Sequence, residues 1–86
     1  MHRTTERFRN CLIRLPDRIQ RTAKKNFELL KINPSHPSLH FKKTGRFWSA
    51  RVGINHRALA VVDGQDFIWV WIGTHDEYEN MIKDTG

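Results

Sequence analysis

Cysteine is almost absent from this sequence of 86 residues, which contains one, Cys11. A lone cysteine cannot form a disulfide within the chain and has no second thiolate with which to bind a metal. The histidines lack the spacing to acidic or cysteine partners that zinc sites use, so we expect no metal and no cofactor. Phosphate-binding glycine loops and serine-nucleophile signatures are missing as well. Any chemistry must therefore come from ordinary polar side chains.

Long apolar stretches are also missing. No run of 18 apolar residues occurs, so we expect no membrane span. The segment Met1–Arg9 lacks the apolar core of a signal peptide. The sequence therefore predicts a cytoplasmic protein without a membrane partner.

Negative charge is scarce. The sequence contains nine Asp and Glu residues and fifteen Lys and Arg residues, which gives a net charge of +6. Such an excess attracts nucleic acid, anionic lipid or an acidic protein. A chain of this length forms one domain, residues 1–86, and buries only about 60% of its unfolded surface. We therefore expect a shallow surface site, with nucleic acid or an acidic protein as partner.

Helical patterns fill the first third of the chain. Thr4 or Thr5 can cap a first helix, whose apolar face holds Phe8, Cys11, Leu12 and Leu15. Pro16 suits the start of a second helix, which we expect over 16–31, because proline is tolerated in the first turn. Its apolar stripe is Ile19, Ala23, Phe27 and Leu30, and its cationic outer face is either solvated or a contact surface.

Strand patterns dominate the remainder. We expect strands near 38–43, 47–53, 56–62 and 67–72, with a hairpin at Asp63-Gly64. The last strand is nearly all apolar, which predicts cover on both faces. Residues 2–4 could start a short edge strand, and 75–83 a last helix. The predicted fold class is α+β, with two N-terminal helices, four strands and a short C-terminal helix.

Arg51 and Arg57 flank the segment Gly53-Ile54-Asn55. If this loop has three residues, the two arginines pair across the strands and share one face, which would suggest a phosphate site. If it has two residues, they separate to opposite faces. Rim salt bridges with Asp63, Asp66 or Glu77 are the other interpretation.

RNA can be cut without a metal, because its own 2′-hydroxyl attacks the adjacent phosphate. The protein then moves protons and stabilises the phosphoryl charge. His75 ends the apolar strand, where a rigid element can aim it, and Tyr78 follows one helical turn later; a helix-start position for His75 and core cover for Tyr78 are the alternatives. Weaker acid–base or RNA-binding candidates are His40, His56, Lys42, Lys43 and Arg46. Trp48, Trp69 and Trp71 could stack on bases, but core packing is favoured.

Ordered motifs along the chain resemble the RelE/ParE superfamily of bacterial and archaeal type II toxins. They are Leu15-Pro16, Leu29-Leu30-Lys31-Ile32-Asn33-Pro34, His36-Pro37-Ser38-Leu39, Trp48-Ser49-Ala50-Arg51-Val52, His56-Arg57-Ala58-Leu59-Ala60 and Trp71-Ile72-Gly73-Thr74-His75-Asp76-Glu77-Tyr78. Each motif alone is weak, whereas their order along nearly the whole chain is fairly specific.

The resemblance implies that the two N-terminal helices pack on a mainly antiparallel four-stranded sheet. It also implies a cognate antitoxin, often acidic, in a small toxin–antitoxin hetero-oligomer. Many members are messenger-RNA interferases that cut codons on the ribosome, whereas ParE-like members inhibit DNA gyrase. In the cutting branch, Arg57 and His75 match functional positions, Tyr78 is similar to a C-terminal aromatic, and Arg51 occupies a position that is often basic.

This sequence differs from the RNA-cutting members in two ways that concern the general base. Some cutting members have a glutamate before the second strand, where this chain has Pro37-Ser38-Leu39-His40, and some have adjacent His and Tyr where this chain separates His75 from Tyr78. His40, His56 or Glu77 would then replace the base. The resemblance favours a ribosome-dependent messenger-RNA endoribonuclease toxin. A non-enzymatic gyrase inhibitor and an inactive nucleic-acid-binding remnant are the alternatives.

Overall fold

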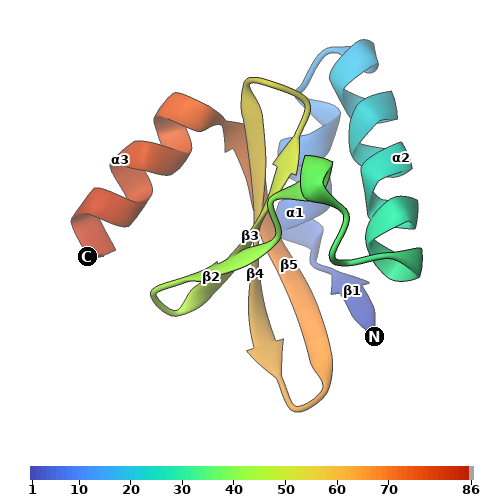
Figure 1. Cartoon of the computed structure of the whole chain (residues 1–86). Coiled ribbons are helices and arrows are strands. Elements are labelled where there is room, and N and C mark those ends of the chain that lie inside the picture. The colour runs from blue at the N-terminus through green and yellow to red at the C-terminus, as the bar shows by residue number, and fades with distance from the viewer. Residues whose placement is uncertain (86) are drawn as a thin grey trace.

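The computed structural model describes residues 1–85, as Figure 1 shows. Its elements follow one another as β1 (His2–Thr4), α1 (Glu6–Ile13), α2 (Asp17–Ile32), the 3-10 helix η1 (Pro37–Leu39), β2 (Lys42–Thr44), β3 (Phe47–Val52), β4 (His56–Asp63), β5 (Asp66–Thr74) and α3 (His75–Thr85). The predicted α+β class is confirmed.

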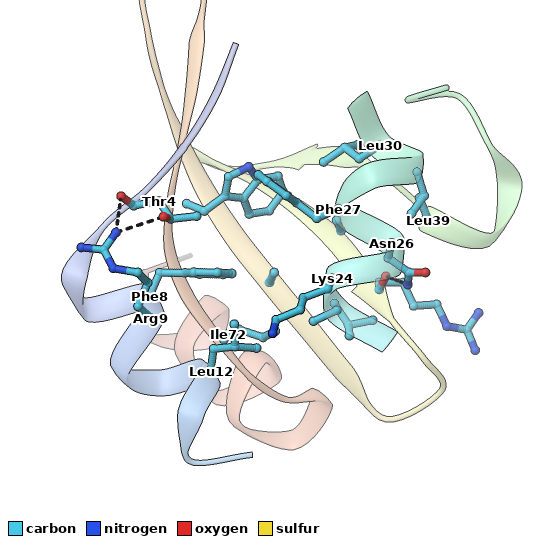
Figure 2. Close-up of a pocket in the computed structure, with 16 residues that line it drawn as sticks. Thr4, Phe8, Arg9, Leu12, Lys24, Asn26, Phe27, Leu30, Leu39 and Ile72 are labelled. Carbon is cyan, nitrogen blue, oxygen red and sulfur yellow. Dashed lines mark hydrogen bonds between the residues drawn. The ribbon is translucent and has the colours of Figure 1, made fainter. Parts of the chain in front are cut away.

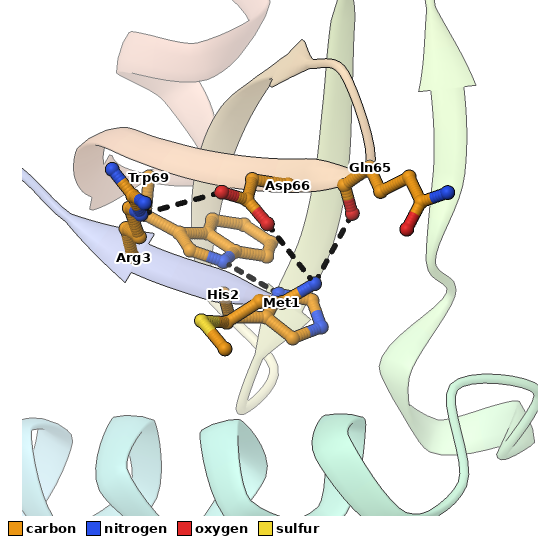
Figure 3. Close-up of polar contacts among 6 residues, drawn as sticks. All are labelled: Met1, His2, Arg3, Gln65, Asp66 and Trp69. Carbon is orange, nitrogen blue, oxygen red and sulfur yellow. Dashed lines mark hydrogen bonds and ion pairs between the residues drawn. The ribbon is translucent and has the colours of Figure 1, made fainter.

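The sheet has five strands in the order β1-β5-β4-β3-β2, so the predicted number of four was too low. The additional strand is β1, the short edge strand considered at residues 2–4, and it runs parallel to β5. Polar contacts hold this edge, as Figure 3 shows: Trp69 Nε1 donates to His2 Nδ1 (3.0 Å), and Arg3 Nε lies 3.3 Å from Asp66 Oδ2. All other neighbouring strands are antiparallel.

The strand expected over 38–43 is wrong at its start. Residues Pro37–Leu39 form a 3-10 turn instead, and β2 begins only at Lys42. Pro37 favours the turn because its ring fixes φ near the helical value. His40 then ends the turn in the left-handed region, with φ of +44°. This bend buries Leu39 completely and turns His40 outward.

The N-terminal helices begin and end close to where the sequence predicts. Thr5 caps α1 by accepting a hydrogen bond from the Phe8 N–H (3.1 Å). Pro16 precedes α2, which runs one residue past the predicted end at Lys31 and stops at Ile32. Local capping and proline signals therefore determined these boundaries.

Helices cover both faces of the sheet, as Figure 1 shows, with α1 and α2 on one side and α3 on the other. Apolar side chains from α1, α2 and η1 meet β3, β4 and β5 on the first side, and Tyr78 of α3 meets Leu59 and Trp71 on the second. The predicted double cover of β5 is confirmed, because Trp69 faces the first layer and Trp71 the second. Trp69 and Trp71 are buried, and Trp48 packs against the core, in agreement with the packing role.

An apolar cavity of about 200 Å³ lies between α1, α2 and the sheet. In Figure 2, Phe8 and Leu12 of α1 lie opposite Phe27 and Leu30 of α2 across this space. Apolar side chains of both helices therefore border this cavity.

Candidate functional site

The β3–β4 connection decides where the two arginines lie. Val52 pairs with His56 and Arg51 pairs with Arg57, which is the register of the three-residue loop. Directly opposed residues of antiparallel strands point to the same face, so both guanidinium groups lie on the side of α3. Gly53 permits the turn with φ of +65°, a conformation that other residues rarely adopt.

A pocket of about 300 Å³ opens beside this loop. It is called the basic pocket below, and it is lined by His40, Arg51, Ile54, His56, Arg57 and His75. Figure 1 shows the reason for this gathering: the β3–β4 loop and the start of α3 lie at the same end of the sheet. The structure thus brings together five of the residues that the sequence singled out.

Arg57 has an unusual environment within the basic pocket. Its Nε and Nη1 atoms are buried and have no hydrogen-bond acceptor among residues 1–85. Its guanidinium carbon lies 5.1 Å from the centre of the Tyr78 ring, a cation–π arrangement. No carboxylate forms an ion pair with it within the described residues, so the expected alternative of a rim salt bridge does not occur there. A buried polar group without a partner costs about 1–3 kcal/mol. The uncompensated charge therefore favours an anion in the pocket.

Arg51 is held at the pocket rim by a backbone carbonyl group and a histidine ring. Its Nε donates to the Gly53 carbonyl oxygen (3.0 Å), and its Nη1 lies 3.5 Å from His40 Nε2. Its charge, like that of Arg57, meets no acidic side chain in the described part of the chain. Two paired arginines without a carboxylate repel each other, and an anion between them removes that repulsion.

His75 is fixed through both its backbone and its ring. Its N–H donates to the Asn55 carbonyl oxygen (2.7 Å), which joins the start of α3 to the β3–β4 loop. Its Nε2 lies 2.9 Å from Glu79 Oε1, one helical turn later. The ring centre is 5.9 Å from that of Tyr78. His75 therefore lines the basic pocket with its backbone fixed to the β3–β4 loop and its ring held by Glu79.

Tyr78 lies beneath the pocket and does not line it. The residue is only 4% exposed, and its hydroxyl donates to Thr44 Oγ1 at 3.4 Å. The core-cover interpretation of Tyr78 therefore describes its packing. Its ring face also supports the Arg57 guanidinium, so it can position that group.

His56 and Glu77 differ as candidates for the general base. Burial lowers the pKa of His56, and the Glu77 carboxylate raises it by a smaller effect. His56 is therefore neutral near pH 7 and can accept a proton. Glu77 instead caps α3, because its Oε1 accepts from both the Thr74 N–H and the Thr74 hydroxyl (2.9 Å each). Those hydrogen bonds lower the pKa of Glu77. Among the candidate bases, Glu77 does not line the basic pocket.

The lysine and arginine candidates of the β2–β3 hairpin lie outside the pocket. Lys42 pairs with Ser49, which places it on the face that carries Arg51, whereas Lys43 pairs with Trp48 on the opposite face. Arg46 is exposed in the turn between the two strands. Only Lys42 is thus oriented to extend the pocket along the sheet.

Sequence reasoning missed two members of this region. Ile54 lines the pocket, and the signal was an apolar residue in the middle of a tight loop between two arginines. Glu79 contacts His75, and the signal was the spacing of four residues on one helix.

The arrangement can bind an anion and move protons around it. Within residues 1–85, no group of three or more His, Cys, Asp or Glu side chains gathers in a way that could hold a metal ion. In the same range, no helix is both long and apolar enough to cross a membrane.

No protein-family model and no curated protein matches the chain. Solved structures do. A chain of the RelB–RelE antitoxin–toxin complex from Methanococcus jannaschii is similar with a TM-score of 0.71 and 20% identity, over 92% of this chain and 96% of that one. The toxin–antitoxin complex RelBE2 from Mycobacterium tuberculosis matches with a TM-score of 0.65 and 23% identity, over 87% and 96%. YafQ from E. coli matches with a TM-score of 0.62 and 15% identity, over 91% and 96%.

These likenesses extend over 87–92% of this chain and 96% of each of the three similar chains. The identities are low, so what they establish is the architecture. It agrees with the expectation drawn from the sequence motifs, and this protein has the fold of the RelE-like toxins.

Proposed function

We propose that this protein is the toxin of a type II toxin–antitoxin system and that it cuts messenger RNA. One observation carries the proposal: Arg51 and Arg57 are paired across β3 and β4, and neither meets a carboxylate in the described residues. Three histidines surround them, so a phosphate held there would have proton donors and acceptors beside it. The RelE-like fold supports the same reading.

In the proposed reaction, the RNA 2′-hydroxyl attacks the adjacent phosphorus. A base takes its proton, the O2′–P bond forms, and the P–O5′ bond breaks as the leaving oxygen receives a proton. Arg57 and Arg51 stabilise the charge on the phosphoryl oxygens. His56 is suited to the base because burial lowers its pKa, and His40 is the second candidate. His75 donates the proton to the leaving oxygen, and Tyr78 positions Arg57 from beneath.

The pocket is small and open for an enzyme that must align a long substrate. About 300 Å³ holds little more than one nucleotide, so we propose that the ribosome presents the messenger RNA to it. Lys42 and Arg46 would contact the RNA backbone from the hairpin. Lys43, on the opposite face, would add only long-range attraction.

An acidic antitoxin is the proposed protein partner. Two of the three similar solved structures named above are antitoxin–toxin complexes. A net charge of +6 would favour a partner of opposite charge in a small hetero-oligomer.

Purified protein added to a bacterial cell-free translation reaction tests this function. New messenger-RNA 5′ ends, mapped by primer extension and dependent on ribosomes, are the expected result. Arg57→Ala should lower the cleavage rate by about 10²–10³-fold, because it removes a charge that stabilises the transition state. Arg21→Ala, which removes an exposed arginine of α2, is the charge-matched control and should retain cleavage.

Intact message with the native protein would refute RNA cleavage. Inhibition of DNA supercoiling by gyrase would then be measured with the same preparation. Equal cleavage by the Arg57→Ala and Arg21→Ala variants, both folded, would refute the role of Arg57.

A further inference from the structure

Ile54 is an exposed apolar side chain in a charged setting. It is 79% exposed at the tip of the β3–β4 loop, where it lines the basic pocket beside two arginines and three histidines. A polar residue would be hydrated there at no cost, whereas an exposed isoleucine gains free energy only when something apolar covers it. What distinguishes Ile54 from other exposed apolar residues such as Ile32 is its place in the basic pocket, where it offers a bound anion an apolar surface beside the charges.

The loop that carries Ile54 is firmly held. On one side, the Gly53 carbonyl oxygen accepts from Arg51 Nε (3.0 Å), and on the other, the Asn55 carbonyl oxygen accepts from the His75 N–H (2.7 Å). The flanking residues Val52 and His56 pair directly across the hairpin. The side chain is thus presented from a fixed backbone, and a ligand that covers it pays little to order the loop.

The neighbours of Ile54 specify what the ligand must combine. The arginines select an anion, and a bare phosphate or a carboxylate would leave Ile54 in water. A nucleotide carries both parts, because its phosphate is charged and the faces of its base are apolar. Isoleucine is also among the apolar side chains that wedge against nucleic-acid bases.

We infer that Ile54 is a base-contacting residue: it packs against the face of a nucleobase next to the phosphate that Arg51 and Arg57 bind. This inference rests on the proposed function and adds a contact with the base beside the bound phosphate. Contact with a base face involves no hydrogen-bond code, so this contact tolerates any of the four bases.

A binding assay separates this role from catalysis. The probe is a short fluorescent 2′-O-methyl RNA, which cannot be cut because the attacking hydroxyl is blocked, and the readout is fluorescence anisotropy at one fixed salt concentration. Ile54→Ser should weaken binding by about five- to tenfold, since partial burial of one aliphatic side chain is lost. Ile54→Leu should bind like the native protein. Ile32→Ser is the matched control, because Ile32 is 82% exposed at the end of α2, outside the basic pocket.

A series of probes, each with one abasic nucleotide, identifies the contact itself. At one position the missing base should weaken native binding about as much as Ile54→Ser does, and the two changes together should cost no more than either alone. In the cleavage assay, Ile54→Ser should raise KM while Arg57→Ala lowers the rate.

Equal binding by the native and Ile54→Ser proteins would overturn the inference, as would native protein that fails to bind the probe. A loss of affinity that persists on every abasic probe would also overturn it. The inference would also be overturned if Ile54→Ser bound the RNA probe normally but bound a protein partner more weakly, because the loop tip would then be a protein contact. The proposed function fails by a different result, the absence of messenger-RNA cleavage by native protein.

Discussion

His56 and Arg57 are sequence neighbours in β4, and their side chains lie in different electrostatic environments. Arg57 keeps its charge against the Tyr78 ring with two buried nitrogens that have no acceptor in the described residues. His56 is buried enough that its pKa is lowered, and its Nδ1 likewise has no partner there. Arg57 therefore provides a permanent positive charge, and His56 provides a neutral imidazole.

The pKa of His56 gives a prediction at this scale. The Glu77 carboxylate raises that pKa, so Glu77→Gln should lower it further, while glutamine can still cap α3. Glu79→Gln removes a carboxylate that contacts His75 instead and should leave the His56 pKa nearly unchanged. NMR titration of the two variants beside the native protein measures this. A rise in the His56 pKa on Glu77→Gln would contradict the electrostatic account.

At the scale of elements, the junction of β5 and α3 positions the site. Thr74 and Glu77 form a reciprocal cap, in which the Glu77 N–H also donates to Thr74 Oγ1 (3.2 Å). Gly73 precedes this cap and pairs with Arg57. Together with the hydrogen bond from the His75 N–H to Asn55 and the packing of Tyr78, these contacts set the direction of α3 and the position of His75.

Position 73 has no space for a side chain, because the Trp71 ring and the Glu77 carboxylate lie against the backbone there. A Cβ there would meet Trp71 Cζ2 and would lie 2.8 Å from Trp71 Cη2 and 2.9 Å from Glu77 Oε1. Gly73→Ala should therefore destabilise the protein by about 1–3 kcal/mol, the usual cost of overpacking. The melting temperature should fall by roughly 4–8 °C for each kcal/mol.

Adding Trp71→Phe to Gly73→Ala provides the control. The smaller ring lacks the atoms that the new methyl group would meet, so the double variant should lose less than the sum of the two single changes. Simple additivity would indicate that the steric conflict with Trp71 is not the cause.

At the scale of the whole molecule, two histidines far apart in the sequence link stability to pH. His2 holds β1 against β5, and burial, the Met1 amino group and Lys31 lower its pKa. Burial lowers the pKa of His56 at the start of the central strand β4. Both residues bind a proton more readily in the unfolded chain, so the stability they contribute is present above the ordinary value of 6.5 and is lost as the pH falls below it.

The expected result is a urea midpoint that decreases between about pH 7.5 and about pH 5.5, the range in which unperturbed histidines titrate. His2→Gln should reduce this decrease, because glutamine does not titrate and its amide oxygen can still accept from Trp69 Nε1. The Glu77 carboxylate adds its own loss only at lower pH, since its pKa lies below 4.5. A decrease as large in His2→Gln as in the native protein would contradict the role of His2.

The sequence by itself determined the features that depend on neighbouring residues. The cap at Thr5, the break at Pro16, the hairpin at Asp63-Gly64 and the apolar run of β5 are each encoded within a few positions, and each element appears where expected. The start of β2 was predicted too early. The 3-10 turn that replaces it buries Leu39 in a core to which other elements contribute, and a local pattern does not contain that information.

Only the tertiary structure decided which candidate residues share the basic pocket. The choice between two loop registers, the parallel pairing of β1 with β5, and the meeting of His40 and His75 beside Arg51 and Arg57 all join residues distant in the chain. Such contacts depend on the packing of the whole sheet and its two helical layers, and no local pattern carries that information. For the same reason Tyr78 was recognised as a candidate from its spacing, whereas its buried place beneath Arg57 emerged only in the fold.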